Sequence, residues 1–148
     1  MVNDILFILA GIFIGYLLCV NKRIIMDRFI PDDPVLSQVK SLCSTVFKDM
    51  QHIPIKKAKE TYTIDKERVY MCTTDKQDQV FPLNTLIYVL LHEYAHIKTT
   101  SIGHTEEFHQ VFDEILDIAI KHGLYNEEEG VDEKYSVDGN CGDQSSHS

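Results

Sequence analysis

Apolar residues form one run near the N-terminus of this 148-residue chain and recur at regular intervals through its middle. The run Ile5–Val20 contains no charged residue and approaches the length of about 20 residues that crosses a bilayer. Asp4 precedes the run and basic residues follow it, so the positive-inside rule places the rest of the chain in the cytoplasm. The sequence therefore predicts a transmembrane anchor over residues 1–23 and a juxtamembrane connector over 24–32.

Three other interpretations of this apolar run are weighed against the anchor. A cleavable secretory signal is disfavoured because no positive charge precedes the run and no small-x-small cleavage site follows it. A lipoprotein signal at Cys19 is disfavoured because Leu18 stands where a small residue is needed, and a buried core helix is the third alternative. Gly11 and Gly15 form a GxxxG pair, a spacing that permits close packing of two membrane helices in a homodimer.

Helical and strand-like spacing alternate in the middle of the chain. Apolar residues at helical intervals predict an amphipathic helix over 33–50. Two strands near 61–64 and 68–73 are expected to pair as a β-hairpin through a polar turn. Two longer helices are expected over 84–99 and 105–121, with Thr105 as N-cap and Gly123 as C-cap of the second. The buried faces of these two helices are expected to consist of Leu86, Ile87, Leu90, Leu91 and Ala95, and of Phe108, Phe112, Ile115 and Ala119.

Acidic residues are concentrated at the C-terminal end. Residues 106–148 contain 12 acidic and two basic residues, whereas residues 1–105 contain 11 acidic and 12 basic ones. This distribution offers no broad basic surface, so no nucleic acid is expected as a partner. A solvated helix face followed by a disordered tail accounts for the acidity, and the tail is expected over 126–148.

The segment HEYAH, residues 92–96, carries two histidines at positions i and i+4 of a predicted helix. On a helix both imidazoles project from one face, one turn apart, where they can bind the same Zn²⁺. Glu93 lies beside His92, where its carboxylate can act as general base on a metal-bound water without binding the metal. Because zinc lowers the pKa of that water to about 7, this pattern is typical of hydrolysis near neutral pH.

His104 supplies a third imidazole. It follows Gly103, which lets the chain turn back over the helix, and lies eight residues after His96. Three histidine ligands leave the fourth tetrahedral position open for water, as hydrolysis requires, whereas a structural site is closed. A carboxylate from Glu114 or Asp117 is the alternative third ligand. Three further histidines are not expected to bind the metal: His52, His109 and His122.

Together these motifs resemble those of the SprT-like and WLM group of zinc metallopeptidases. The shared features are HExxH, a short glycine-ended loop, and the segment GHTEEF, residues 103–108, that opens an aromatic helix. The similarity extends from about Thr61 to Tyr125, and the strand at 68–72 corresponds to one that pairs with substrate backbone in zincins. The whole arrangement is most similar to small membrane-anchored WLM-type proteins of large DNA viruses. Carried over by position, the resemblance implies the zinc ligands His92, His96 and His104, the catalytic base Glu93, and a phenylalanine below the third ligand, Phe108.

This resemblance implies an α+β protein, with an N-terminal transmembrane helix and a small zincin-like domain over 33–125 made of a helix, a β-hairpin, the active-site helix and a C-terminal helix. The implied function is a membrane-anchored zinc metallopeptidase that hydrolyses peptide bonds in a protein or peptide substrate. The alternative is a non-catalytic membrane or virion protein in which zinc stabilises the fold or helps to dock a partner. The presence of Glu93 favours the enzyme, because a structural zinc site needs no base.

Some properties of the group are not carried over. SprT-like repair proteases usually carry basic or zinc-binding DNA modules, which this sequence lacks, so a role in DNA–protein crosslink repair is not implied. The residue that stabilises the oxyanion is not assigned, and Tyr94, Tyr125 and Tyr135 are all candidates. Cys141, in the acidic tail, could bind the open zinc position and silence the enzyme, or it could have no role at the site.

Overall fold

The computed structural model describes residues 33–135 of the chain. The predicted transmembrane anchor, the connector, the pair Gly11 and Gly15, and Cys141 all lie outside the described residues. Within residues 33–135, no helix combines the length and the apolar character needed to cross a bilayer. The predictions of a membrane anchor and of a cytoplasmic location therefore stay predictions.

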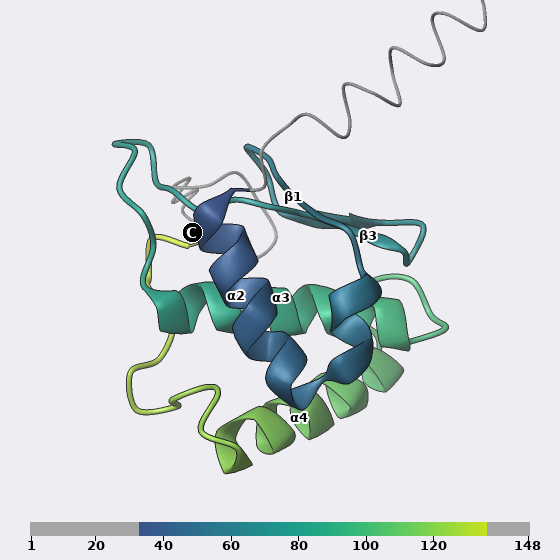
Figure 1. The fold of residues 1–148 in the computed structure, drawn as a ribbon. Helices are drawn as coiled ribbons and strands as arrows, with labels where there is room; N and C mark the ends of the chain where they lie inside the picture. The colour runs from purple at the N-terminus through teal and green to yellow at the C-terminus, as the bar shows by residue number, and fades with distance from the viewer. Residues whose placement is uncertain (1–32, 136–148) are drawn as a thin grey trace, which may run out of the picture. The chain divides into compact units, whose positions relative to one another are not determined.

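The described residues form an α+β fold, as the sequence predicts (Figure 1). Helix α3 runs between the sheet and helix α4, and helix α2 packs across it (Figure 1). The helix that carries HEYAH is thus the central element of the domain. In chain order the elements are α2 (Pro34–Val46), the 3-10 helix η1 (Lys48–His52), β1 (Ile55–Lys57), β2 (Tyr62–Ile64), β3 (Arg68–Met71), α3 (Leu83–Lys98) and α4 (Glu106–Lys121).

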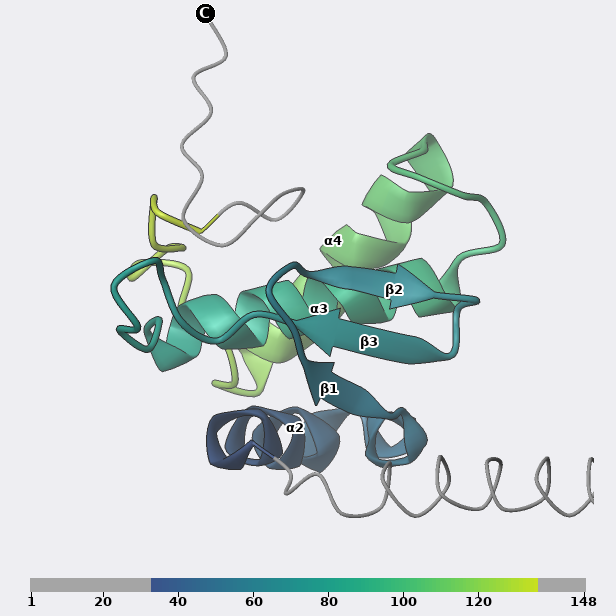
Figure 2. The ribbon, with the colours of Figure 1, turned by 90° about the horizontal axis from the view of Figure 1, so that it is seen from above.

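The sheet has the strand order β1-β3-β2. Strands β2 and β3 form the predicted antiparallel hairpin, and β1 adds to β3 in parallel. Figure 2 shows β2 at one edge of the sheet and β1 at the other, beside α2. The prediction that the strand at 68–72 pairs with substrate is therefore wrong. This strand, β3, already pairs with a strand on each side, whereas β2 lies at an edge of the sheet.

The ends of the helices are set by local geometry, which corrects one predicted boundary and confirms the predicted caps of α4. Asp33 caps α2, since its Oδ1 accepts hydrogen bonds from the backbone N–H groups of Val35 and Leu36. The helix expected over 33–50 ends at Val46, because Phe47 leaves helical geometry and the chain continues as the shorter η1. The caps of α4 are confirmed, with Thr105 at its start and Gly123, at φ 66°, just after its end.

Helix α3 is buried on nearly all sides. The predicted apolar face is buried. Polar residues elsewhere on the helix are buried too, including Asn84, Thr85 and Glu93. The sheet, α2 and α4 each cover a part of the helix, so no face is left to solvent along most of its length. The polar side chains on α3 must therefore find partners inside the protein.

Residues 126–135 supply several of these partners. The Asn84 side chain donates to the carbonyls of Asn126 and Gly130, both at 2.9 Å, and accepts from the Asn126 N–H at 2.9 Å. Thr85 Oγ1 accepts from the Asp132 N–H at 2.9 Å, and Tyr135 is buried against Phe81. The folded part therefore extends through Tyr135 and does not end at the expected boundary of 125, because backbone groups of this segment bind the buried side chains of Asn84 and Thr85 on α3.

Candidate metal centre

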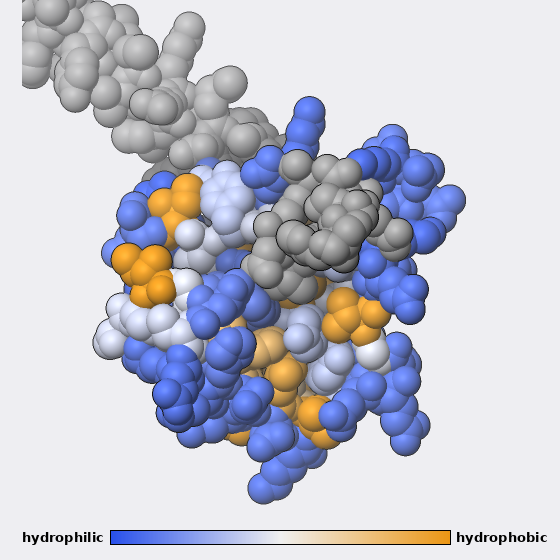
Figure 3. Space-filling view, turned by 180° about the vertical axis from the view of Figure 1, so that it is seen from behind, coloured by the Kyte–Doolittle hydropathy of each residue, from blue (hydrophilic) through white to orange (hydrophobic). Residues whose placement is uncertain are grey.

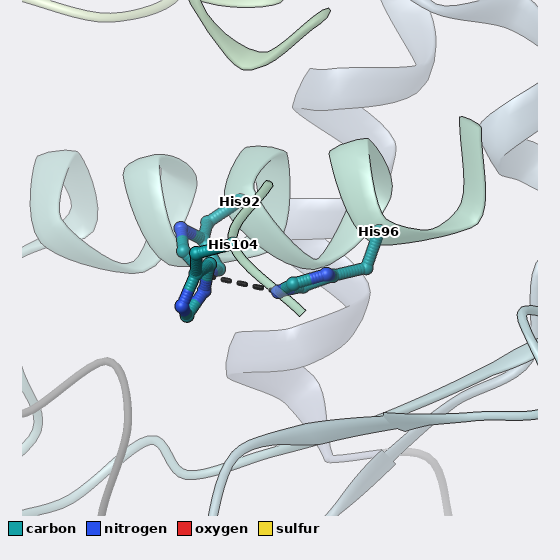
Figure 4. A group of neighbouring side chains, drawn as sticks. All are labelled: His92, His96 and His104. Carbon is teal, nitrogen blue, oxygen red and sulfur yellow. Dashed lines mark hydrogen bonds between the residues drawn. The ribbon is translucent and has the colours of Figure 1, made fainter. Parts of the chain in front are cut away.

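Three histidine side chains converge at one end of the domain. Helix α3 supplies His92 and His96, one turn apart, and the loop before α4 supplies His104. The Nε2 atom of His92 lies 3.2 Å from that of His96 and 3.0 Å from that of His104. One ligand atom from each residue lies within 4.8 Å of the others, and Figure 4 shows the three rings pointing toward one another. The structure thus brings together the three histidines that the sequence singles out.

The donor set and its spacing fit a zinc ion. Tetrahedral zinc with Zn–N distances of about 2.0–2.1 Å holds its ligand nitrogens about 3.3 Å apart, close to the separations observed here. Among residues 33–135 this is the only group of three metal-ligating side chains. Glu114 and Asp117, the alternative third ligands, are exposed on α4 and lie outside the group. The cluster can therefore hold a metal ion through three imidazoles.

Burial prepares His92 for metal binding. Its side chain is 8% exposed, whereas His96 is half-buried and His104 is exposed. Burial, followed by the nearby His96, His104 and His109, lowers the pKa of His92 to about 3. His92 is therefore neutral at physiological pH and keeps a nitrogen lone pair to offer to a cation.

An aromatic side chain forms the floor of the histidine cluster. Phe108 is 1% exposed, and its ring centroid lies 4.9 Å from His92, 4.3 Å from His96 and 4.8 Å from His104. Phe112, one turn further along α4, contacts His92 alone among the three, at 5.2 Å. Phe108 therefore packs against all three histidines, as the resemblance implied.

The loop that carries His104 is held from two sides. Lys66, at the tip of the β2–β3 hairpin, donates to the carbonyls of Thr99 and Ser101. Glu107, in the first turn of α4, accepts from the N–H groups of Thr100 at 2.9 Å and Ser101 at 3.0 Å. These bonds, with that of Thr100 first, lower the pKa of Glu107 to about 2. The stabilisation of the loop by ionised Glu107 is complete above the ordinary glutamate pKa of 4.5 and is lost as the pH falls toward 2.

Replacing Glu107 by Gln is expected to weaken zinc binding about tenfold, since residues that orient metal ligands contribute about 10- to 100-fold. The amide has one acceptor oxygen where the carboxylate uses two, so the loop before His104 is held less firmly. Competition with a chromophoric chelator measures the affinity. Glu106→Gln is the matched control, because Glu106 is an exposed glutamate in the same turn. Equal weakening in both variants would attribute the effect to charge alone.

Glu93 is buried beside the histidine cluster. Like His92 and His96, it lies on α3 and lines a cleft. It is 3% exposed, and its Oε2 accepts a hydrogen bond of 2.5 Å from Thr63 Oγ1 on β2. The cleft, of about 680 Å³, lies between β2, α3 and the loop after α3. Its lining consists of Thr61, Tyr62, Thr63, Asp65, Lys66, His92, Glu93, His96, Ser101, Ile102 and Gly103. The Glu93 carboxylate and two of the three histidines, His92 and His96, thus line one cleft.

Two hydrophobic side chains at this cleft are open to solvent. Ile102 is 91% exposed, the highest value among the large hydrophobic residues of the described part, and Tyr62 is 40% exposed. On the face of the molecule shown in Figure 3, hydrophobic side chains form separate patches among hydrophilic ones. A second cleft, of about 450 Å³, is lined by His104 and Phe108 on the side of α4, and His92 lines both clefts. The histidine cluster therefore borders both clefts, with His96 in the lining of the first and His104 in that of the second.

None of the three candidate tyrosines lines the 680 Å³ cleft. The Tyr94 hydroxyl donates to Asp49 at 2.7 Å, and Tyr125 packs against Tyr88 with ring centroids 5.5 Å apart. The Tyr135 hydroxyl contacts Thr61, and burial, with the nearby charge of Glu93, raises the pKa of Tyr135 to about 12. The histidines not expected to bind the metal are exposed and lie outside the metal-ligating group: His52, His109 and His122.

The chain is similar in sequence to proteins of two invertebrate iridescent viruses and of a mimivirus. It is 37% identical over 81 residues to uncharacterized protein 136R of Invertebrate iridescent virus 6, a match that covers 53% of this chain and 46% of the relative. Uncharacterized protein 042R of Invertebrate iridescent virus 3 is 37% identical over 76 residues, with 51% and 48% covered. Uncharacterized protein R325 of Acanthamoeba polyphaga mimivirus is 33% identical over 67 residues, with 44% and 34% covered. The chain thus spans about half or less of these curated relatives, and no protein-family model matches it.

Two crystal structures of Wss1 from Saccharomyces cerevisiae, one of them a mutant, are similar in fold. Each has a TM-score of 0.51 and 14% sequence identity to this chain. The mutant structure covers 62% of this chain and 82% of its own, and the other covers 61% and 80%. This similarity supports the WLM-type metallopeptidase fold that the sequence predicts, and at this identity it concerns the fold alone.

Proposed function

We propose that the chain is a WLM-type zinc metallopeptidase, with His92, His96 and His104 as ligands and Glu93 as general base. Three histidine nitrogens converge within 4.8 Å, and the buried Glu93 carboxylate lines the same cleft as His92 and His96; this arrangement carries the proposal. Bound zinc would lower the pKa of a coordinated water to about 7 and polarise the scissile carbonyl. Glu93 accepts a proton from the attacking water and passes it to the leaving amine nitrogen.

Strand β2 is the side of the cleft that receives the substrate backbone. It is the edge strand of the sheet, and Tyr62 and Thr63 line the cleft directly opposite α3. An extended peptide adds to such an edge through main-chain hydrogen bonds. Tyr62 and Ile102 offer apolar contact to substrate side chains near the scissile bond.

The enzyme acts close to a membrane in this proposal. The uncharged run Ile5–Val20 and the basic residues that follow it support an anchored form with its catalytic domain at the cytoplasmic leaflet. The similarity to viral proteins is compatible with a role in infected cells or in virions. Tethering would restrict the substrates to proteins that reach the membrane surface.

Metal removal tests the proposal directly. The 148-residue chain, purified in a mild detergent, is expected to contain about one zinc ion and to cleave an unstructured protein such as casein. Treatment with a chelator should abolish cleavage, and Zn²⁺ but not Mg²⁺ should restore it, because Mg²⁺ prefers oxygen ligands. Elemental analysis measures the zinc content, and gel electrophoresis measures the cleavage of the substrate. Zinc without cleavage of any unstructured protein would favour the non-catalytic alternative, and a lack of zinc would refute the metal centre.

A further inference from the structure

Thr63 on β2 and Thr61, which directly precedes this strand, both point into the protein. In the segment TYTI, residues 61–64, alternate side chains point to opposite faces of the sheet. Thr61 is buried and Thr63 half-buried, whereas Tyr62 and Ile64 are exposed. Both threonines are therefore directed into the protein, and the Thr63 hydroxyl reaches the helix that carries Glu93.

Thr63 binds the carboxylate of Glu93 directly. Thr63 Oγ1 lies 2.5 Å from Glu93 Oε2 and 3.4 Å from the Glu93 backbone carbonyl. An ionised carboxylate can only accept hydrogen bonds, so the hydroxyl is the donor. The distance is that of a short, charge-assisted hydrogen bond, and Glu93 is 3% exposed, so water competes little for the same oxygen.

The chain is also fixed directly before the strand that carries Thr63, at Thr61. Thr61 Oγ1 accepts from the Cys72 N–H at 3.1 Å and contacts the Tyr135 hydroxyl at 2.6 Å. The Tyr135 hydroxyl donates to the Cys72 carbonyl at 3.2 Å, which closes a ring of three hydrogen bonds. This ring holds β2 in register with β3, so the position of Thr63 relative to α3 is well defined.

We propose that Thr63 is a positioning residue for the general base, an inference that rests on the proposed function. By holding Oε2, Thr63 fixes the plane of the Glu93 carboxylate and directs the other oxygen, Oε1, toward the reacting water. The strand that pairs with substrate thereby also orients the base. The hydrogen bond between Thr63 and Glu93 thus joins β2 and α3, the two sides of the cleft.

Thr63→Val and Thr63→Ser separate this role from a merely structural one. Valine keeps the shape and the β-branching of threonine but has no donor, whereas serine keeps the donor and loses a methyl group. Thr63→Val is expected to lower kcat about 10- to 100-fold with KM changed less than about twofold, and Thr63→Ser to recover most of that loss. Zinc content should equal that of the parent in both variants. An unchanged kcat in Thr63→Val, or equal losses in both variants, would overturn the proposal.

A double-mutant cycle in the zinc-free 148-residue chain tests the contact without any measurement of activity. Thr63→Val, Glu93→Ala and the double variant are unfolded in urea, and the coupling between the two sites is calculated, since each single change removes one partner of the hydrogen bond. The combined effect is expected to differ from the product of the single effects by about tenfold in the unfolding equilibrium constant. Independent effects would overturn the proposal even if cleavage is observed. If the parent binds zinc but cleaves nothing, the proposed function fails and the positioning role fails with it, whatever the coupling.

Discussion

Replacing Glu93 by Gln is expected to lower kcat for peptide-bond hydrolysis about 10²- to 10⁴-fold while zinc content stays unchanged. Gln has the shape of Glu and can still accept the hydrogen bond from Thr63, so the buried site keeps its packing. Its amide cannot take a proton from water near neutral pH, so only the general-base role is removed. Initial rates on an unstructured protein and elemental analysis measure the two properties in the same preparation.

Glu114→Gln is the matched control for Glu93→Gln. Glu114 is an exposed glutamate on α4 outside the metal-ligating group, so this variant should keep both zinc and the parent rate. Loss of zinc in Glu114→Gln would restore the alternative in which a carboxylate on α4 is the third ligand. Undiminished cleavage by Glu93→Gln would contradict the assignment of the base and require another proton acceptor.

Phe108→Ala is expected to lower the free energy of unfolding by about 3–5 kcal/mol and to weaken zinc binding as well. The ring is 1% exposed and contacts all three histidines, so truncation leaves a cavity directly below the cluster. The histidine rings then lose the surface that fixes their orientation. Urea unfolding of the zinc-free protein and competition with a chelator measure the two effects separately.

Phe112→Ala distinguishes a local effect from a global one. Phe112 is also buried, but it contacts only His92 within the cluster and packs against Tyr88. We expect a comparable loss of stability in Phe112→Ala and a smaller loss of zinc affinity. Equal losses of affinity in the two variants would show that Phe108 acts through overall stability and not through the orientation of the ligands.

The candidate site could be found from the sequence because its information is local. His92, Glu93 and His96 lie within two turns of one helix, and helical spacing alone puts both histidines on one face. His104 and Phe108 follow within a few residues of a glycine turn and a capped helix. Caps and periodicity depend on neighbouring residues, so this part of the fold could be predicted without knowing any long-range contact.

The supporting contacts could not be found in this way, because each joins distant parts of the chain. Thr63 and Glu93 are 30 residues apart, and Thr61 and Tyr135 are 74 apart. Strand β1 has three residues, too few to show alternation, and pairs with β3 only in the folded protein. The polar composition of residues 126–135 predicts disorder until Asn84 and Thr85 are known to be buried and in need of partners.

The nearly complete burial of α3 also affects when the histidine cluster can form. A helix covered on nearly all sides is only marginally stable before its neighbours pack on it, because most of its stability comes from tertiary contacts. The sheet precedes α3 in the chain, whereas α4 and the segment through Tyr135 follow it. A nascent chain is therefore expected to complete the histidine cluster only after synthesis has passed Tyr135, because α3 lacks its last packing partners until then.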